Sequence, residues 1–373
     1  MVTHSASSLN EGGDEVMLTR RSFLAQGAMA LAGGVALADE RDSLPDGSAS
    51  KGMITREAEE AIRKGLAYLS RNRNQDNGYG STVNYRGNIA VTSLAGLAFM
   101  AGGHEPGRGQ YGKIVTDCVE FVLNHEAANP PGYLHNPNAT PHGPMYGHGF
   151  GTLLLAEVHG MVASKRLRTR VKDTLKRAVQ VIINSQNGEG GWRYFPLKRD
   201  ADISVTICQI MALRSARNAG IAVPKNVVDK CVDYVKRCQE ENGSFRYQAQ
   251  MIGRGHGNTF ARTAAGVSAL YSAGIYKGRE IDKGLRHLMQ FKPPSQFPRF
   301  DMHYFYGHYY AVQAMWTAGG NYWTEWFPAI RDELVNNQKA DGRWDDAICY
   351  HYGTAMASII LQVPNNYLPI LQK

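Results

Sequence analysis

The sequence lacks the signatures by which many enzymes are recognised. It contains no Walker loop, no dinucleotide-binding glycine fingerprint, no nucleophile elbow and no cluster of cysteines with zinc-ligand spacing. The five cysteines are scattered and odd in number, so they do not indicate a disulfide framework. Function therefore has to be inferred from residues that recur along the chain, not from one local motif.

Charge and hydrophobicity exclude two further classes of protein. The formal net charge is +8, but no nucleic-acid recognition motif accompanies the basic residues, which we expect on solvated helix faces. No segment is long and apolar enough for a confident membrane span, and no strand pattern is convincing. The sequence thus predicts neither a nucleic-acid partner nor a transmembrane protein, and it favours helices throughout.

The N-terminus has the features of an export signal. Paired arginines stand in Thr19–Leu24, an apolar stretch of small residues follows from Ala25 to Leu37, and Asp39 comes directly after a small-residue cleavage pattern. This arrangement resembles a twin-arginine signal. We expect residues 1–38 to be the signal, residues 39–52 a flexible lead, and residues 53–373 a single domain that works in the periplasm or another extracytoplasmic space.

One short phrase recurs along the chain: glutamine, three residues, glycine, one residue and a large aromatic. It stands at Gln186–Trp192, Gln239–Phe245 and Gln338–Trp344. Less complete copies extend the series, so that the six aromatics are Tyr79, Tyr133, Trp192, Phe245, Phe297 and Trp344, in steps of 54, 59, 53, 52 and 47 residues. Recurrence at this spacing predicts six structural units, each long enough for two helices.

Each unit contains an amphipathic pattern followed by a run rich in small residues. The amphipathic patterns predict outer helices at 56–71, 113–124, 170–184, 226–237, 281–289 and 326–336. The small-residue runs predict inner helices, crowded round an axis, at 89–100, 150–161, 204–219, 261–273, 307–317 and 353–361. Two aligned columns on the inner runs are expected to ring one end: Thr92, Thr152, Thr206, Thr263, His308 and Thr354, and one turn earlier Asn88, His148, Asp202, Thr259, Tyr304 and Tyr350.

The repeated phrase between helix pairs resembles the motif of the prenyltransferase and squalene cyclase repeat superfamily, over roughly residues 55–363. The resemblance implies an all-α fold, an (α/α)6 barrel or toroid of six helix hairpins. It also implies an apolar central cavity that holds an isoprenoid chain or another apolar small molecule. It favours an enzyme, either a prenyltransferase or a terpene cyclase.

The resemblance predicts a Zn²⁺ site. Asp301, His303 and His351 fall on the positions at which β subunits of protein prenyltransferases hold zinc, with His303 in place of a cysteine. A carboxylate and two imidazoles leave one position of a tetrahedral zinc open, as a catalytic site requires. The alternative is packing of aromatic and imidazole rings with ordinary hydrogen bonds.

A second resemblance concerns an acid. The segment Asp200-Ala-Asp202-Ile-Ser204 resembles the Asp-x-Asp-Asp-Thr motif of squalene-type cyclases, and Asp202 falls on the position of the acid that protonates an alkene. The alternative is that Asp202 only caps the inner helix. The substrate-binding residues expected at the same rim are Tyr146, Tyr304 and Tyr350, whose rings would stabilise carbocations, together with His148 and the basic Arg193.

Two other functions stay open from the sequence. The barrel is also suited to bind a lipid or a partner without catalysis, having kept the fold and lost the chemistry. A carbohydrate-active barrel is the other rival, and it requires two carboxylates facing each other across a cleft.

Overall fold

The computed structural model describes residues 50, 52–139, 141–251, 259–294 and 303–372. The predicted export signal, most of the predicted lead, Phe297 and Asp301 lie outside these residues. Within them the chain forms six helix hairpins, as predicted. The odd-numbered helices are α1 (Arg56–Arg71), α3 (Gly112–Asn124), α5 (Lys165–Ser185), α7 (Lys225–Arg237), α9 (Arg279–Met289) and α11 (Gly320–Asn337). The even-numbered helices are α2 (Ile89–Ala101), α4 (Pro144–Val158), α6 (Ile203–Asn218), α8 (Thr259–Ser272), α10 (Tyr304–Ala318) and α12 (Tyr350–Gln362).

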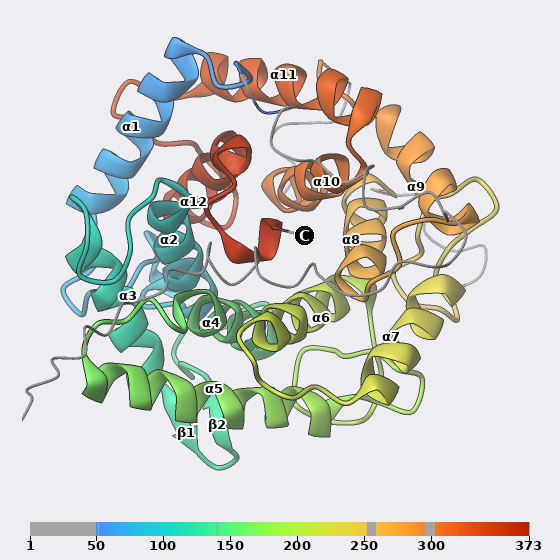
Figure 1. Cartoon of the computed structure of the whole chain (residues 1–373), viewed down its shortest axis with the longest axis horizontal. Coiled ribbons are helices and arrows are strands. Elements are labelled where there is room, and N and C mark those ends of the chain that lie inside the picture. The colour runs from blue at the N-terminus through green and yellow to red at the C-terminus, as the bar shows by residue number, and fades with distance from the viewer. Residues whose placement is uncertain (1–49, 51, 140, 252–258, 295–302, 373) are drawn as a thin grey trace, which may run out of the picture. The chain divides into compact units, whose positions relative to one another are not determined.

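The even-numbered helices form a closed inner ring, and the odd-numbered helices surround it (Figure 1). Each inner helix packs against the inner helix before and after it, and α12 packs against α2, so that the ring closes. In the outer layer α11 contacts α1, so the last hairpin meets the first there as well. The predicted (α/α)6 barrel is confirmed.

The two layers follow from composition. In α2 all residues except Ala90 are buried, because this helix is covered by both ring neighbours and by the outer layer. In α9, by contrast, the buried face is Ile281, Gly284, Leu285, His287 and Leu288, while the other positions are charged except for Met289. Small apolar residues therefore go to the centre and amphipathic sequences to the wall.

The glutamine of the repeated phrase joins neighbouring units. Gln186 Nε2 donates to the carbonyl of Gly190 in its own turn and to the carbonyl of Val227 in α7, both at 2.9 Å. Gln239 does the same toward α9. Gln338 donates to Ala61 O in α1 at 2.8 Å, so the last unit is bonded to the first. This bond closes the barrel in the same way as the internal junctions are formed.

The glycine of the phrase is required at the same junctions. Gly190, Gly243 and Gly342 have φ values of 101°, 89° and 97°, which L residues rarely adopt. A Cβ atom on Gly342 would lie 2.5 Å from Lys64 O of α1, and the other two glycines approach α7 and α9 as closely. The turn therefore touches the backbone of the next outer helix, and only glycine fits.

Most of the threonine column has a structural role. The backbone amides of Tyr79, Trp192, Phe245 and Trp344 donate to the hydroxyls of Thr92, Thr206, Thr263 and Thr354 at 2.9–3.2 Å. Each threonine thus satisfies a buried amide in the turn before its own helix. This explains why the aromatic and the threonine recur together.

Several details differ from the sequence prediction. A short antiparallel hairpin, β1 (Glu126–Ala128) and β2 (Pro131–Leu134), stands in the second unit, where no strand was expected. Helix α4 begins at Pro144 instead of residue 150. The prediction missed its first turns because their glycine-rich sequence lacks a clear helical pattern. Helix α11 begins at Gly320 instead of residue 326. Among the described helices, none has the length and apolar character needed to cross a membrane.

Candidate active site

A cavity opens at the N-terminal ends of the inner helices. Its volume is about 360 Å³, within the range of small-molecule sites. Its wall contains residues from all six inner helices and from the loops that precede them. The side chains with aromatic rings or charge are Tyr85, His142, Tyr146, Phe150, Tyr194, Tyr247, Arg262, His303, Tyr306 and Tyr352.

One residue of each inner helix lies in the cavity wall at the same repeat position. It stands two residues before the threonine column, which is about 200° round a helix and so on the opposite face. The six residues are Ala90, Phe150, Ser204, Ala261, Tyr306 and Tyr352. The two predicted columns lie at the correct end of the barrel, but on the helix face that packs outward. The six residues that stand two positions before the threonine column face the cavity instead.

Asp202 is a buried acid that interacts with tyrosines of this wall. It is 0% exposed and caps α6, with its Oδ1 accepting from the Val205 amide at 2.8 Å. Burial raises the pKa of Asp202 to about 6, although hydrogen bonds from the Val205 amide and the Tyr247 hydroxyl and the charge of Arg193 act in the opposite direction. The predicted helix cap is therefore present, and the same carboxyl holds its proton more tightly than an ordinary aspartate.

Aromatic rings separate Asp202 from the cavity. Asp202 is not part of the wall, but Tyr146 and Tyr247 both line it, and the charge of Asp202 contributes to the raised pKa of each. The hydroxyls of Tyr247 and Tyr194 are 2.5 Å apart. Tyr247 thus stands beside both the buried carboxyl and the Tyr194 hydroxyl, and its side chain reaches the cavity wall.

Arg193 lies on the outer side of this set. Its Nε is 3.6 Å from Asp202 Oδ2, and its guanidinium also pairs with Asp200. The guanidinium stacks over the rings of Tyr194 and Tyr247, at 4.9 and 5.8 Å from their centroids. Arg193 is not among the residues of the wall, so in this arrangement it holds the acid and the two tyrosines in place.

A tyrosine–histidine pair stands at a different part of the wall. The Tyr85 hydroxyl bonds His142 Nδ1, and the two rings stack with centroids 5.8 Å apart. Burial raises the pKa of Tyr85 to about 12. Tyr85 is half-buried and His142 is exposed, so the pair connects the cavity with solvent.

Of the five predicted substrate-binding residues, Tyr146 alone lines the cavity. His148 is fully buried and bonds the Leu134 amide and the Ala178 carbonyl, both at 3.2 Å. The Tyr304 hydroxyl donates to Glu333 of α11 at 2.6 Å. Tyr350 is 42% exposed beside the mouth, with Arg343 stacked on its ring. The geometry gives His148 and Tyr304 roles in joining the inner and outer layers.

The described residues give no support to the predicted zinc site. His303 lines the cavity, but His351 lies apart from the wall, where its Nδ1 accepts from the Gly80 amide at 2.9 Å and its ring bonds the Asn72 backbone. Among the residues that the structure describes, no three His, Cys, Asp or Glu side chains are placed to hold a metal. Since Asp301 lies outside them, zinc stays a prediction, and no step below depends on it.

The sequence reasoning missed Tyr194 and Tyr247. Both stand two residues after the aromatic of the repeated phrase, at Trp192 and Phe245. The isolated pairing of Trp192 with Asp202, and the bond from the Ile203 amide to Tyr247 O, bring these segments to the head of α6. The recurring offset of two residues was visible in the sequence and was the signal that could have found them.

Comparison with solved structures identifies proteins that share this architecture. The type II terpene cyclase MstE from Scytonema matches with a TM-score of 0.57 over 84% of this chain and 100% of that chain, at 14% identity. The chain has the terpenoid cyclase fold. The same cyclase in complex with geranylgeranyl dihydroxybenzoate matches with a TM-score of 0.56 over 84% of this chain and 98% of that chain, at 12% identity. A cellobiose 2-epimerase from Bacillus thermoamylovorans has the same TM-score of 0.56, over 83% of this chain and 99% of that chain, at 12% identity. The terpenoid cyclase fold is therefore shared with a protein that acts on a sugar.

Sequence comparison finds a similar protein over about half of this chain. No family model matches the chain. A drimenyl diphosphate synthase from Streptomyces showdoensis is 26% identical over 196 residues, which is 52% of this chain. The alignment spans 33% of that protein, so the chain corresponds to about a third of this relative's length.

Proposed function

We propose that this protein is a type II terpene cyclase-like enzyme, which binds an isoprenoid in the barrel and starts its cyclisation by protonating an alkene. The observation that carries the proposal is Asp202: a fully buried carboxyl with its pKa raised to about 6, next to an aromatic cavity. Protonation of an alkene requires a carboxyl that is still protonated near neutral pH and shielded from water. The likeness of the fold to a type II terpene cyclase supports the same reading.

The proton reaches the cavity through Tyr247 in this mechanism. Asp202 gives its proton to the Tyr247 oxygen while the hydroxyl proton of Tyr247 passes to an alkene carbon. The π bond of that alkene is consumed, and the neighbouring carbon becomes a cation. Tyr247 ends unchanged, and the carboxylate of Asp202 is left beside Arg193, whose charge stabilises it.

The cavity wall supplies the stabilisation that the cation needs. Phe150, Tyr306 and Tyr352 occupy three of the six repeat positions, and Ala90, Ser204 and Ala261 occupy the others. Aromatic faces attract a cation by about 0.5–2 kcal/mol each without offering a strong nucleophile. Ser204 and Ala261, on the neighbouring helices α6 and α8, and Ala90 on α2 leave room between the rings for a folded polyprenyl chain.

The final proton is taken by Tyr85 and His142. A C–H bond next to the last cation breaks and its electrons form the product alkene. The released proton goes to the Tyr85 oxygen as the Tyr85 hydroxyl proton moves to His142 Nδ1, with which it is already hydrogen-bonded. Because His142 is exposed, the imidazolium then loses a proton to solvent. The reaction is an isomerisation, since one proton enters and one leaves.

The alternative, a non-catalytic barrel, predicts that neither the wild type nor a variant at Asp202 forms a product. Purified protein is incubated with polyprenyl diphosphates and with uncharged polyprenyl arenes, and products are separated by gas or liquid chromatography with mass detection. The proposed function predicts a cyclic isomer with the wild type and none with Asp202→Asn, although both bind the substrate. Binding without product by the wild type under all these conditions favours the non-catalytic alternative.

A further inference from the structure

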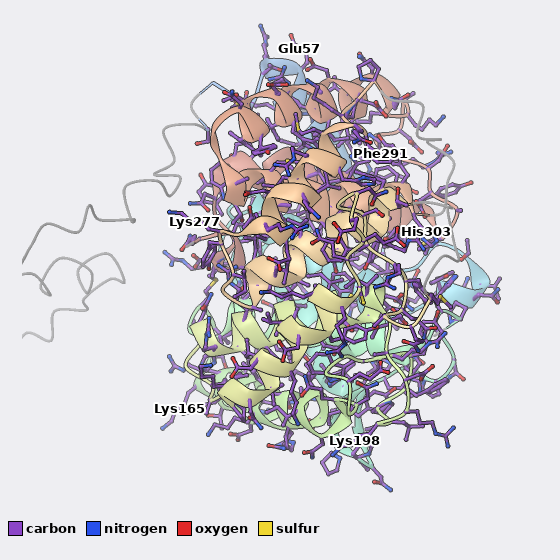
Figure 2. All side chains as sticks on the ribbon, turned by 90° about the vertical axis from the view of Figure 1, so that its right-hand side faces the viewer. Glu57, Lys165, Lys198, Lys277, Phe291 and His303 are labelled. Carbon is purple, nitrogen blue, oxygen red and sulfur yellow. The ribbon has the colours of Figure 1, made fainter. Side chains whose placement is uncertain are left out.

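Depth in the barrel increases along each inner helix. The cavity wall takes its residues from the first half of these helices and from the loops before them. Figure 2 shows the same direction: His303 at the mouth lies on one side, whereas Lys165 and Lys277, which follow the ends of α4 and α8, lie toward the other. A residue one turn later than a wall residue therefore lies one turn deeper, below the cavity.

Two tyrosines of α10 cross the barrel at this depth. Tyr309 and Tyr310 are buried and stand about one turn after Tyr306, a residue of the wall. In the ring, α8 lies between α10 and α6 and packs against both. The Tyr310 hydroxyl nevertheless reaches α6, where it is 3.3 Å from Cys208 Sγ. The Tyr309 hydroxyl is 3.9 Å from Met211 Sδ of the same helix, so both side chains point toward the axis of the barrel.

Rings of the cavity wall rest on these two tyrosines. The Tyr306 ring meets the Tyr310 ring edge-on, with centroids 4.8 Å apart. Phe150 comes from α4, on the opposite side of the inner ring, and its centroid is 6.1 Å from that of Tyr309. The rings of Tyr309 and Tyr310 are themselves 4.9 Å apart. The four rings thus form a continuous aromatic layer on the deep side of the cavity.

Helix α8 provides the space that the tyrosines fill. The residues that follow the wall residue Ala261 on the same helix face are Ala265 and Ser268, about one and two turns deeper. Both are buried, and Ser268 Oγ donates to Tyr310 O at 2.9 Å, so this face of α8 lies against α10 at Tyr310. Because all three positions of α8 have small side chains, the Tyr310 ring is the group that blocks the way deeper along this helix.

We infer that Tyr310 forms the floor of the cavity and sets the length of the hydrocarbon chain that the cavity accepts. The thiol of Cys208 is a weak hydrogen-bond partner, so the ring of Tyr310 and not its hydroxyl closes the floor. A smaller residue at this position opens the cavity toward Ala265. That the natural chain is a polyprenyl group rests on the proposed function, whereas the depth of the cavity is measured with simple chains and without catalysis.

The test is isothermal titration calorimetry of the full chain with straight-chain primary alcohols of increasing length. Each methylene that enters an apolar space raises affinity about fourfold, so the affinity of the wild type should rise until the chain meets Tyr310. The length at which the rise stops is here called the limiting length. Tyr310→Ala is expected to increase it by about four carbons and Tyr310→Leu by about two, because the vacated space relaxes only in part. The leucine variant carries the test if the alanine variant does not fold.

Cyclisation assays separate this inference from the proposed function. With polyprenyl substrates, Tyr310→Ala is expected to favour a chain one isoprene unit longer than the wild type does. If neither protein forms a product from any such substrate, the proposed function is contradicted. A limiting length that differs between the two proteins would still establish Tyr310 as the floor.

Tyr310→Phe and Tyr271→Leu are the matched controls. The first keeps the ring, and the second empties a buried tyrosine site in the last turn of α8, outside the cavity wall. Both are expected to keep the limiting length within about one carbon of that of the wild type. Thermal unfolding shows that each variant is folded. The inference is overturned if the wild type binds none of the alcohols, if Tyr310→Leu has the same limiting length as the wild type, or if Tyr271→Leu shifts it as far.

Discussion

The raised pKa of Asp202 makes a quantitative prediction about stability. Its pKa is about 6 in the folded protein and 3.8 is its ordinary value, so the folded state holds this proton more tightly than the unfolded state. A carboxyl of this kind contributes stability that is fully present below the unfolded pKa and is lost as pH rises from about 4 to about 6. A difference of about two pKa units corresponds to about 3 kcal/mol in the free energy of unfolding.

Asp202→Asn isolates this contribution. Asparagine keeps an oxygen that can accept from the Val205 amide and cap α6, but it cannot ionise. We therefore expect the free energy of unfolding of the variant to rise relative to that of the wild type by about 2.4 kcal/mol between pH 4 and pH 8, measured by urea unfolding at both pH values. Comparing the two proteins cancels the titration of all other groups, and Asp200→Asn serves as an exposed control.

The opposite pH dependence of this stability difference would contradict the proposed mechanism. If the wild type gains on Asp202→Asn as pH rises, the ion pair with Arg193 outweighs burial and the pKa of Asp202 is depressed. A group ionised in that way would not be an acid for alkenes near neutral pH. The proposed mechanism would then lose its proton donor, although the fold would be unaffected.

Three further predictions concern the junctions and the relay. Gly342→Ala should lower the free energy of unfolding by about 1–3 kcal/mol more than Gly220→Ala, since both have positive φ but a Cβ atom meets a neighbouring backbone only at Gly342; equal losses in chemical denaturation would refute the close approach. Thr206→Val should cost about 1–3 kcal/mol by leaving a buried amide unpaired, and Thr206→Ser should restore most of it in the same experiment. Tyr247→Phe should lower turnover by about 10²–10⁴ while substrate affinity stays near that of the wild type; an unchanged rate would show that Asp202 donates its proton by another route.

Much of the fold could be predicted because the residues of the repeated phrase recur for physical reasons. The glycine of the phrase is forced by positive φ and a close backbone approach, as at Gly190, and the glutamine is placed to donate to the next helix. Such constraints recur in sequence because they recur in space. Elements outside the repeat, such as the β1–β2 hairpin and the early start of α4, were not predictable in this way.

The site was predicted less well, because the orientation of a helix about its axis decides which residues meet. Asp202 was found since capping and burial coincide at the head of α6. His148 and Tyr304 have the residue types of a binding site, but they share a helix face with the threonine column and turn toward the outer layer. Without the turn contacts of the threonines, nothing in the sequence distinguished that face from the one toward the cavity.

The experiment that tests the central claim most directly is cyclisation in deuterated water. If Asp202 starts the reaction by protonation, the product must contain one deuterium at the carbon that was protonated, and any diphosphate or other head group of the substrate must be retained. We expect a product one mass unit heavier from the wild type in D₂O, by mass spectrometry, and no product from Asp202→Asn. A product without solvent deuterium, or the same product from Asp202→Asn, would contradict the account.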